Sequence, residues 1–293
     1  MRVSQLDPGR PGPMSDIVLE PRYEILPFGD VEEQAAQTGE PLRLTVTTSP
    51  KHGIARSLDV AIRLRALGHN VTLHLAARMV RAEAHLDEIL ERCLGVGIDD
   101  LLVIGGDAPD PLGPFTDAGE LLDVLQDRPR PERIGIGAYP EGHPLIPTQV
   151  LEAALAHKAR IADYIVTQLC FDAQTLLTWV DRLRERGIDR PVYIGAVGAV
   201  ERRRLLEIST KIGVGLSLRF LRNQHGLTAL VRSPADTAGT FYDSVAPQLG
   251  APRRGIVGFH FFTFNDLLGT RRWQEERRTA LGRSAKIRGW SAP

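Results

Sequence analysis

Eight short β-rich runs alternate with longer helical patterns along the chain after residue 20. The runs are RYEILP (22–27), LRLTVTT (42–48), NVTLHLAA (70–77), DLLVIGG (100–106), RIGIGAY (133–139), YIVTQLC (164–170), PVYIGAV (191–197) and GIVGFHFFTFN (255–265). A strand that is followed by a crossover helix usually leads to a parallel strand in the same sheet. Eight such units predict a single (β/α)₈ TIM barrel over residues 21–282. A doubly wound open sheet is the main alternative, but no GxGxxG opens the first helix.

Three stretches fall outside this rhythm. Residues 200–250 are longer than one helix needs, so we expect an extra helix there, with helices near 200–212 and 234–248. Residues 1–20 contain Pro and Gly but no hydrophobic run, which predicts a disordered lead and argues against a signal peptide. A last helix near 266–281 should be followed by a C-terminal tail over residues 283–293.

The charge balance and the cysteine content narrow the class of partner. Lys and Arg together number 36, as do Asp and Glu, so the basic excess typical of nucleic-acid binding is missing. No apolar stretch approaches the ~18 residues that suggest a membrane span. Cys93 and Cys170 lack metal-site spacing, which predicts buried thiols in a reducing compartment. We therefore expect a cytoplasmic protein with a small-molecule partner, and homo-oligomer formation stays open.

Polar residues gather where the predicted strands end, which is where active sites form in a barrel of this kind. They are Glu24, Thr45, Thr47, Thr48, His74, Asp107, Tyr139, Glu141, His143, Gln168, Asp172, His260, Thr263 and Asn265. The stretch AYPEGHP places Tyr139, Glu141 and His143 in one loop, although a plain turn could be made with Asn, Gly or Ser. We expect this loop to form one wall of a site.

Each of these residues also has a structural interpretation. Glu24 sits in an apolar strand, where a carboxylate is costly unless it is paired or protonated, and this favours function over a structural ion pair. His74 fits a satisfied core histidine equally well. Asp107 follows two glycines, which permit close approach to a ligand, but it would also form a turn. Gln168 stays undecided, and Asp172 is predicted to be the N-cap of the following helix.

Several common chemistries lack their motifs in this sequence. There is no GxSxG elbow, no GxxxxGK[ST] phosphate loop and no HExxH zinc motif. Glu24, Asp107 and Glu141 have no recognisable metal-ligand spacing, so we expect no metal site. His52 and His69 are interpreted as surface-loop residues.

Six motifs in order resemble the methylenetetrahydrofolate reductase family. They are YEILP, LHLAAR, GGD.P, AYPEGHP, TQLCFD and GFHFFTFN, and they span about Tyr23 to Asn265. The length matches the family's catalytic barrel alone. The resemblance implies reduction of 5,10-methylenetetrahydrofolate to 5-methyltetrahydrofolate, with NAD(P)H reducing a bound FAD that passes hydride to the folate.

The resemblance also implies a role for individual residues. Glu24 is similar to the acid that protonates N10 of the folate, and Asp107 is similar to the catalytic aspartate near the flavin and the pterin. Gln168 resembles a pterin-binding amide. The positions that resemble cofactor-binding residues are Thr45, His74, Gly106, Asp107, Tyr139, His143 and Lys158.

The chain departs from the family pattern at several positions. Gly105 stands where members commonly have Arg, and Asp266 stands where Arg often follows the last strand. Lys158 is the one basic residue clearly kept in the helix after the fifth strand. Since some bacterial relatives pass hydride from NADH directly to folate, FAD and direct transfer both stay open. Arg219, with Arg222, is a candidate for binding a glutamate tail or phosphates, with a surface position as the alternative.

Three other functions remain in competition. The same chemistry can run as methyltetrahydrofolate oxidation in one-carbon catabolism. A folate- or flavin-binding barrel without redox activity fits the loss of Arg at Gly105, although Glu24 argues against it. An unrelated barrel acting on a phosphorylated metabolite would need a glycine-rich phosphate site, for which GAVGAV is the only candidate.

Overall fold

All eight predicted strands form and close into a parallel barrel. The computed structural model describes residues 21–198 and 234–287. The strands are β1 (Arg22–Ile25), β2 (Arg43–Val46), β3 (Asn70–Ala76), β4 (Asp100–Ile104), β5 (Arg133–Ala138), β6 (Tyr164–Thr167), β7 (Val192–Val197) and β8 (Ile256–Phe262). They pair in sequence order, and β8 pairs with β1 to complete the circle. The TIM-barrel prediction is confirmed.

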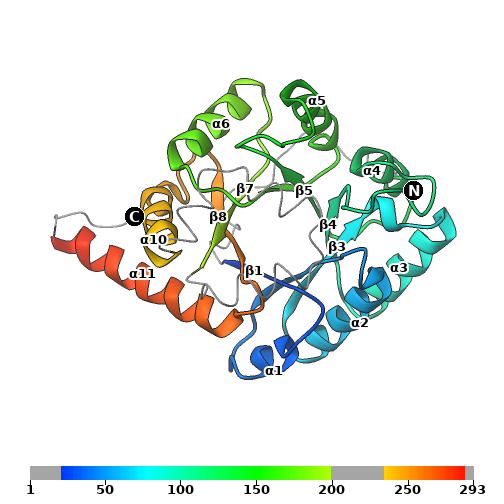
Figure 1. Cartoon of the computed structure of the whole chain (residues 1–293), viewed down its shortest axis with the longest axis horizontal. Helices are drawn as coiled ribbons and strands as arrows, with labels where there is room; N and C mark the ends of the chain where they lie inside the picture. The colour runs from blue at the N-terminus through cyan, green and yellow to red at the C-terminus, as the bar shows by residue number, and fades with distance from the viewer. Residues whose placement is uncertain (1–20, 199–233, 288–293) are drawn as a thin grey trace, which may run out of the picture.

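Helices surround the barrel on its outer side (Figure 1). They are α1 (Val31–Ala36), α2 (Gly53–Ala66), α3 (Glu83–Gly95), α4 (Ala118–Leu125), α5 (Thr148–Lys158), α6 (Ala173–Glu185), α10 (Pro234–Val245) and α11 (Leu267–Ile287), with short 3₁₀ turns η2 (Ala77–Met79) and η3 (Ala246–Gln248). The predicted helix near 234–248 is thus confirmed as α10 and η3, whereas the one near 200–212 lies outside the described residues. The last helix continues past residue 282, where the sequence placed the start of the tail.

The alternation of side chains along each strand separates two cores. In β1, Tyr23 and Ile25 point outward and pack against the helix layer with residues such as Leu58 of α2. The inward-facing residues form a second, smaller cluster, which contains Leu102, Tyr164, Val166, Tyr193 and Val257. Successive side chains of a strand point to opposite faces, so one apolar run supplies both cores.

The N-terminal end of the barrel is filled by a polar network around Arg22. Its guanidinium is 1% exposed and lies 2.9 Å from the Asp100 carboxylate, at the start of β4. Arg22 also donates to Tyr164 Oη at 3.1 Å and to Thr72 Oγ1 at 3.0 Å. The Tyr164 hydroxyl in turn donates to Asp100 at 2.6 Å. The charges are paired at this end, which leaves the C-terminal end of the strands for a site.

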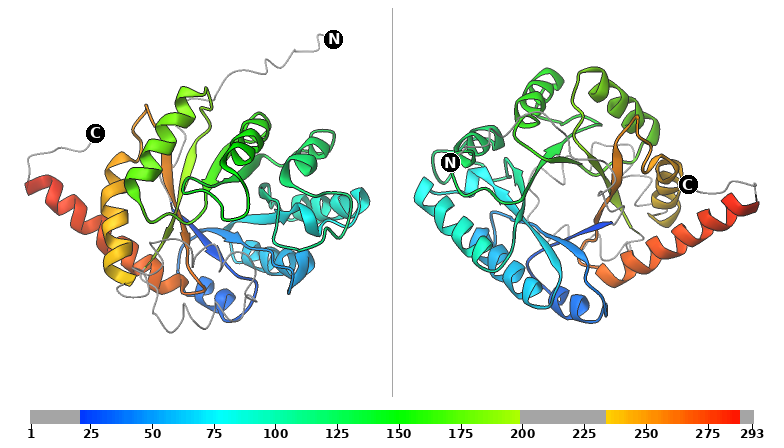
Figure 2. Two further views of the ribbon diagram at one scale, coloured as in Figure 1. Left: turned by 45° about the horizontal axis from the view of Figure 1, so that its top comes forward. Right: turned by 180° about the vertical axis from the view of Figure 1, so that it is seen from behind.

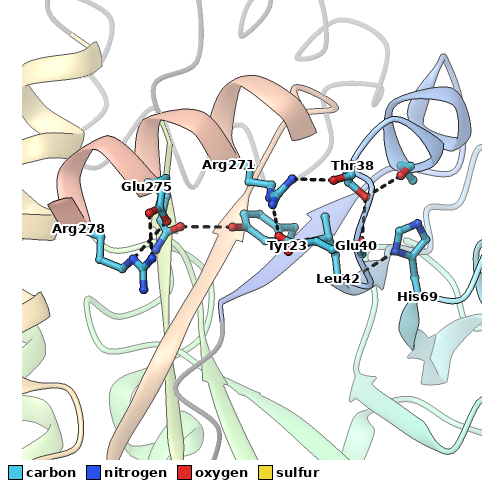
Figure 3. Close-up of polar contacts among 10 residues, drawn as sticks. Tyr23, Thr38, Glu40, Leu42, His69, Arg271, Glu275 and Arg278 are labelled. Atoms are coloured by element: carbon cyan, nitrogen blue, oxygen red, sulfur yellow. Dashed lines mark hydrogen bonds and ion pairs between the residues drawn. The ribbon is translucent and has the colours of Figure 1, made fainter.

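The last helix is held across the outside of the barrel, where it contacts both α10 and α1 (Figure 2). Figure 3 shows Arg271 of α11 reaching the turn between α1 and β2. There it donates to the Thr38 carbonyl at 3.2 Å and pairs with Glu40. The same region contains His69, whose Nδ1 accepts from the Leu42 N–H at 3.1 Å. His69 is buried, so its assignment to a surface loop was wrong; it satisfies a buried backbone donor instead.

Asp100→Ala should strongly destabilise the barrel, because it leaves the Arg22 guanidinium buried without its counterion. Breaking a buried pair from one side costs about 3–5 kcal/mol, which urea denaturation would measure as a lower free energy of unfolding. Asp59→Ala is the matched control, since Asp59 pairs with Arg92 at 2.8 Å with side chains 48% and 38% exposed. That control should lose no more than about 1 kcal/mol. Equal losses in the two variants would contradict the importance of the network.

Candidate functional site

Three side chains from three strands meet on the inner face of the barrel. Glu24 of β1 lies with its Oε2 atom 3.1 Å from Nε2 of His260 in β8 and 3.7 Å from Nε2 of His74 in β3. The Glu24 side chain is 14% exposed, while those of His74 and His260 are 9% and 1% exposed. The carboxyl group is therefore enclosed by two imidazoles but still open to solvent on one side.

Burial sets the protonation state of this cluster. It raises the pKa of Glu24 to about 7, against the opposing effect of His74. It lowers the pKa of His74 to about 4 and the pKa of His260 to about 3. Both imidazoles are therefore neutral at pH 7, and the contact between Glu24 and His260 is a hydrogen bond and not an ion pair. A carboxyl group with a pKa near neutrality is suited to general acid catalysis.

His260 is the residue of this cluster to which the sequence assigned no role. It was visible at the end of a strand, but its partner Glu24 is 236 residues away. Its Nδ1 atom is buried without a hydrogen-bond partner among the described residues. We assign the ring proton to Nε2 when Glu24 is ionised, because that tautomer donates to the carboxylate and leaves no buried N–H unpaired.

A second group forms at the barrel mouth, where β4 and β5 end. Asp107 is exposed. Burial raises the pKa of Tyr139, and the negative charge of Asp107 raises it further. Burial lowers the pKa of His143, and the same carboxylate opposes that shift. The rings of Tyr139 and His143 meet edge to face, with centroids 5.2 Å apart. The structure thus brings Asp107, which follows β4, close to Tyr139 and His143 of the loop AYPEGHP.

Arg78 holds the loop that carries Asp107. Its guanidinium donates to the carbonyls of Ala108 at 2.7 Å, Pro109 at 2.6 Å and Thr116 at 3.1 Å. Sequence reasoning missed this residue, although it closes the motif LHLAAR, because its acceptors are backbone atoms that leave no pattern in the sequence. Gly106 precedes Asp107 with a φ of +89°, and a Cβ there would lie 2.9 Å from the Cβ of Ala76. Only glycine fits that position without displacement.

Several polar residues near the mouth hold loops in place. Glu141 accepts from the backbone N–H groups of Phe171 at 2.6 Å and Asp172 at 2.9 Å, so it braces the loop after β6. Asp172 caps α6 by accepting from Gln174 and Thr175, as predicted. The side-chain oxygen of Gln168 accepts from the Leu169 N–H at 2.8 Å.

Thr45 and Lys158, both predicted to contact the cofactor, lie in different parts of the barrel. Thr45 is buried on β2, and its hydroxyl, like those of Thr47 and Ser49, has no hydrogen-bond partner in the part of the chain that the structure describes. Lys158 instead donates to the Gly137 carbonyl at 3.1 Å. It lines a cleft of about 510 Å³ between α5 and α6, whose lining includes Tyr139 but not Glu24 or Asp107. Burial lowers the pKa of Lys158 to about 8.

Other predictions from the sequence have definite outcomes. Cys93 and Cys170 are both buried and unpaired, which confirms the interpretation as buried thiols. Across residues 21–198 and 234–287, no helix combines the length and the apolar character needed to cross a membrane. Arg219 and Arg222 lie outside the described residues.

The family model of methylenetetrahydrofolate reductase matches residues 34–217. The chain belongs to the methylenetetrahydrofolate reductase family. It is 26% identical over 208 residues to methylenetetrahydrofolate reductase 1 of Schizosaccharomyces pombe, a match that covers 66% of this chain and 33% of the relative. It is 25% identical over 252 residues to 5,10-methylenetetrahydrofolate reductase of Pectobacterium carotovorum, with 84% and 76% covered. A third relative, methylenetetrahydrofolate reductase 2 of Saccharomyces cerevisiae, is 28% identical over 148 residues, which is 46% of this chain and 24% of that protein. The chain therefore spans a third or less of the two yeast relatives.

Two solved structures share the barrel. A Clostridium thermocellum protein described as binding two copies of 5-methyl-5,6,7,8-tetrahydrofolic acid superposes with a TM-score of 0.57 at 13% identity, covering 92% of this chain and 95% of its own. A riboflavin lyase with modified FMN and riboflavin gives a TM-score of 0.55 at 7% identity, with 94% and 93% covered. At these identities the likeness shows the fold alone.

The structure shows the surroundings of Gly105 and Asp266, two positions at which the chain departs from the family pattern. A Cβ added at Gly105 would meet nothing within 4 Å, so there is open space where family members commonly have Arg. Asp266 accepts from the Gly269 N–H at 3.2 Å, at the first turn of α11. A carboxylate at that position compensates the positive end of the helix dipole, which explains an acidic residue there.

Glu24→Gln should stabilise the fold at alkaline pH. A rise in pKa from 4.5 to about 7 means that the folded chain holds the Glu24 proton more tightly than the unfolded chain does. Stability from this group is therefore full below pH 4.5 and is lost as the pH rises through 7. The loss is at most about 3 kcal/mol, at about 1.36 kcal/mol for each pKa unit. The free energy of unfolding, measured at pH 5 and at pH 8, should be higher for the variant than for the wild type mainly at pH 8. An equal difference at the two pH values would contradict the raised pKa of Glu24.

Proposed function

We propose that this chain reduces 5,10-methylenetetrahydrofolate to 5-methyltetrahydrofolate, with NAD(P)H as the source of hydride. The observation that carries the proposal is Glu24, a carboxyl group with a pKa of about 7 on the inner face of a barrel of this family. The reaction needs one hydride at the bridging carbon and one proton at N10. A residue that is protonated near neutral pH and partly open to the mouth can supply that proton.

The proton transfer assigns distinct roles to the residues of the cluster. Glu24 protonates N10 as the bond between N10 and the bridging carbon breaks, and hydride adds to the carbon that remains on N5. His260 holds the carboxyl group through its hydrogen bond of 3.1 Å. His74 lies beside the carboxyl group as a neutral imidazole, because burial keeps its ring uncharged at the pH of the reaction. In this proposal Asp107, at the mouth, hydrogen-bonds the pterin together with the amide of Gln168.

FAD is the carrier that we propose between NAD(P)H and folate, supplying reversible hydride transfer when it is bound. The buried hydroxyls of Thr45, Thr47 and Ser49 have no partner among the described residues, and they fit the polar edge of a flavin ring. Binding of the diphosphate is weaker than the family pattern implies, because Gly105 carries no charge and Lys158 is bonded to the Gly137 carbonyl. A solved relative in fold that is described with FMN and riboflavin supports a flavin in such a barrel.

Reduced folate as the substrate is supported by the family and by the structural neighbour described as binding a methylated tetrahydrofolate. The same residues catalyse the reverse oxidation, because an acid in one direction is a base in the other. With a pKa of about 7, Glu24 is present in both its protonated and its ionised form near neutral pH, so it can serve either direction.

Glu24→Gln should lower folate reduction by about 10²- to 10⁴-fold, the usual contribution of a general acid. Oxidation of NAD(P)H by an artificial acceptor should remain unchanged, because that step needs no proton from Glu24. In the wild type the rate of folate reduction should fall as the pH rises above 7. An equal loss of both activities would contradict the acid role, and absence of wild-type turnover, with or without added FAD, would contradict the proposed function.

Gly105→Arg should raise the affinity for FAD by about tenfold or more, the value of one charge-assisted hydrogen bond to a phosphate. The new side chain has open space, and Gly105 does not need a positive φ. Gly95→Arg is the matched control: it adds the same charge at the end of α3, where a Cβ also meets nothing within 4 Å. A fluorescence titration with FAD measures the affinities. Equal affinity of both variants and the wild type would show that position 105 does not face the cofactor.

A further inference from the structure

The inward cluster of the barrel is also a set of metal donors. Glu24 offers a carboxylate oxygen, and His74 and His260 each offer an imidazole nitrogen; these three atoms all lie within 4.8 Å of one another. Two imidazoles and one carboxylate are a common donor set for zinc and other divalent transition ions. Ligand atoms on a tetrahedral zinc at about 2.0–2.2 Å are separated by roughly 3.4 Å. Oε2 of Glu24 lies 3.1 Å from Nε2 of His260 and 3.7 Å from Nε2 of His74, on either side of that value.

We propose that Glu24, His74 and His260 form a binding site for a divalent transition ion such as Zn²⁺, with the remaining coordination position open to the barrel mouth. The sequence predicted no metal site, because that judgement rested on the spacing of Glu24, Asp107 and Glu141. The donors that meet in the structure come from β1, β3 and β8, and no local spacing connects them.

The state of each donor supports this assignment. Nε2 of His74 is buried and has no hydrogen-bond partner in the described part of the chain. All three donors stand on strands of a closed barrel, so little ordering is needed when an ion binds. The exposed edge of Glu24 gives the ion a route from the mouth.

One feature limits the affinity of the site. Coordination through Nε2 of His260 places the ring proton on Nδ1, for which the described residues provide no acceptor. Metal-ligating histidines usually donate that proton to a carboxylate or a carbonyl, and loss of such a partner weakens binding about 10- to 100-fold. We therefore expect a reversible site of micromolar strength and not a permanently loaded structural one.

An ion at this site would inhibit the proposed reaction. It binds the carboxylate of Glu24, the group that must be protonated to act as the acid for N10, so a metal-bound chain has no acid. This consequence rests on the proposed function, whereas the binding of the ion does not.

The binding test uses Co²⁺, whose visible absorption becomes strong when it leaves octahedral water for a four- or five-coordinate protein site. The full chain without an affinity tag, stripped with a chelator, should bind one Co²⁺ with these bands, and Zn²⁺ should displace it. His260→Asn and Glu24→Gln should each weaken binding at least about tenfold. His157→Asn is the control, because His157 is exposed and pairs with Asp123 on the outer helices.

The outcomes separate the alternatives. Glu24→Gln keeps the shape of the side chain, so its unfolding curve and circular dichroism distinguish a lost ligand from a lost fold. Absence of the bands in the wild type, or full-strength binding in either ligand variant, overturns the metal site. Binding of Co²⁺ by a chain that never reduces folate leaves the site intact and removes only the proposed function. Turnover of the metal-free chain that Zn²⁺ does not inhibit overturns the shared role of Glu24.

Discussion

The pairing of β8 with β1 closes the barrel, and the site depends on that closure. In this pair Arg22 stands opposite His260 and Glu24 stands opposite Phe262, so the last strand is fixed in register against the first. The register places an imidazole from one end of the chain against a carboxyl group from the other. A shift of β8 by one residue would turn His260 toward the helix layer and away from Glu24, since strand side chains alternate between faces. The acid and its histidine partner are thus a product of barrel closure.

One short strand serves two opposite requirements. Arg22 and Glu24 face the same side of β1, two residues apart, and both are largely withdrawn from water. Arg22 meets a carboxylate, a phenol and a hydroxyl, so its charge is compensated. Glu24 meets two neutral imidazoles, so its charge is not compensated, and its pKa rises. At the N-terminal end of the barrel the buried charge of Arg22 is paired and hydrogen-bonded, and this network stabilises the fold. Toward the C-terminal end the buried carboxyl group of Glu24 has no cationic partner, and this leaves it reactive.

The loops at the mouth are fixed by contacts with their backbones. Arg78 binds three carbonyls of the loop after β4, and Glu141 binds two N–H groups of the loop after β6. These contacts leave Asp107, Tyr139 and His143 as the side chains that face one another at the opening. Precise placement of site residues on loops requires this kind of support from neighbouring groups. The two glycines before Asp107 differ: Gly106 has a positive φ and no room for a Cβ, while a Cβ at Gly105 would meet nothing within 4 Å.

The sequence by itself determined the strands, their parallel order and the family, because these follow from local alternation and from motifs of a few residues. It also located Glu24, since a carboxyl group in an apolar strand is unusual over a window of six residues. The tertiary structure decided which polar residues meet. Glu24 and His260 are brought together by strand pairing, Arg78 acts through carbonyls that every residue has, and His69 is buried although its neighbours in sequence suggest a loop. Lys158 kept the position expected from the sequence, yet its side chain bonds to the backbone of β5. Local patterns encode the elements, whereas contacts between distant strands and with backbone atoms arise only when the barrel closes.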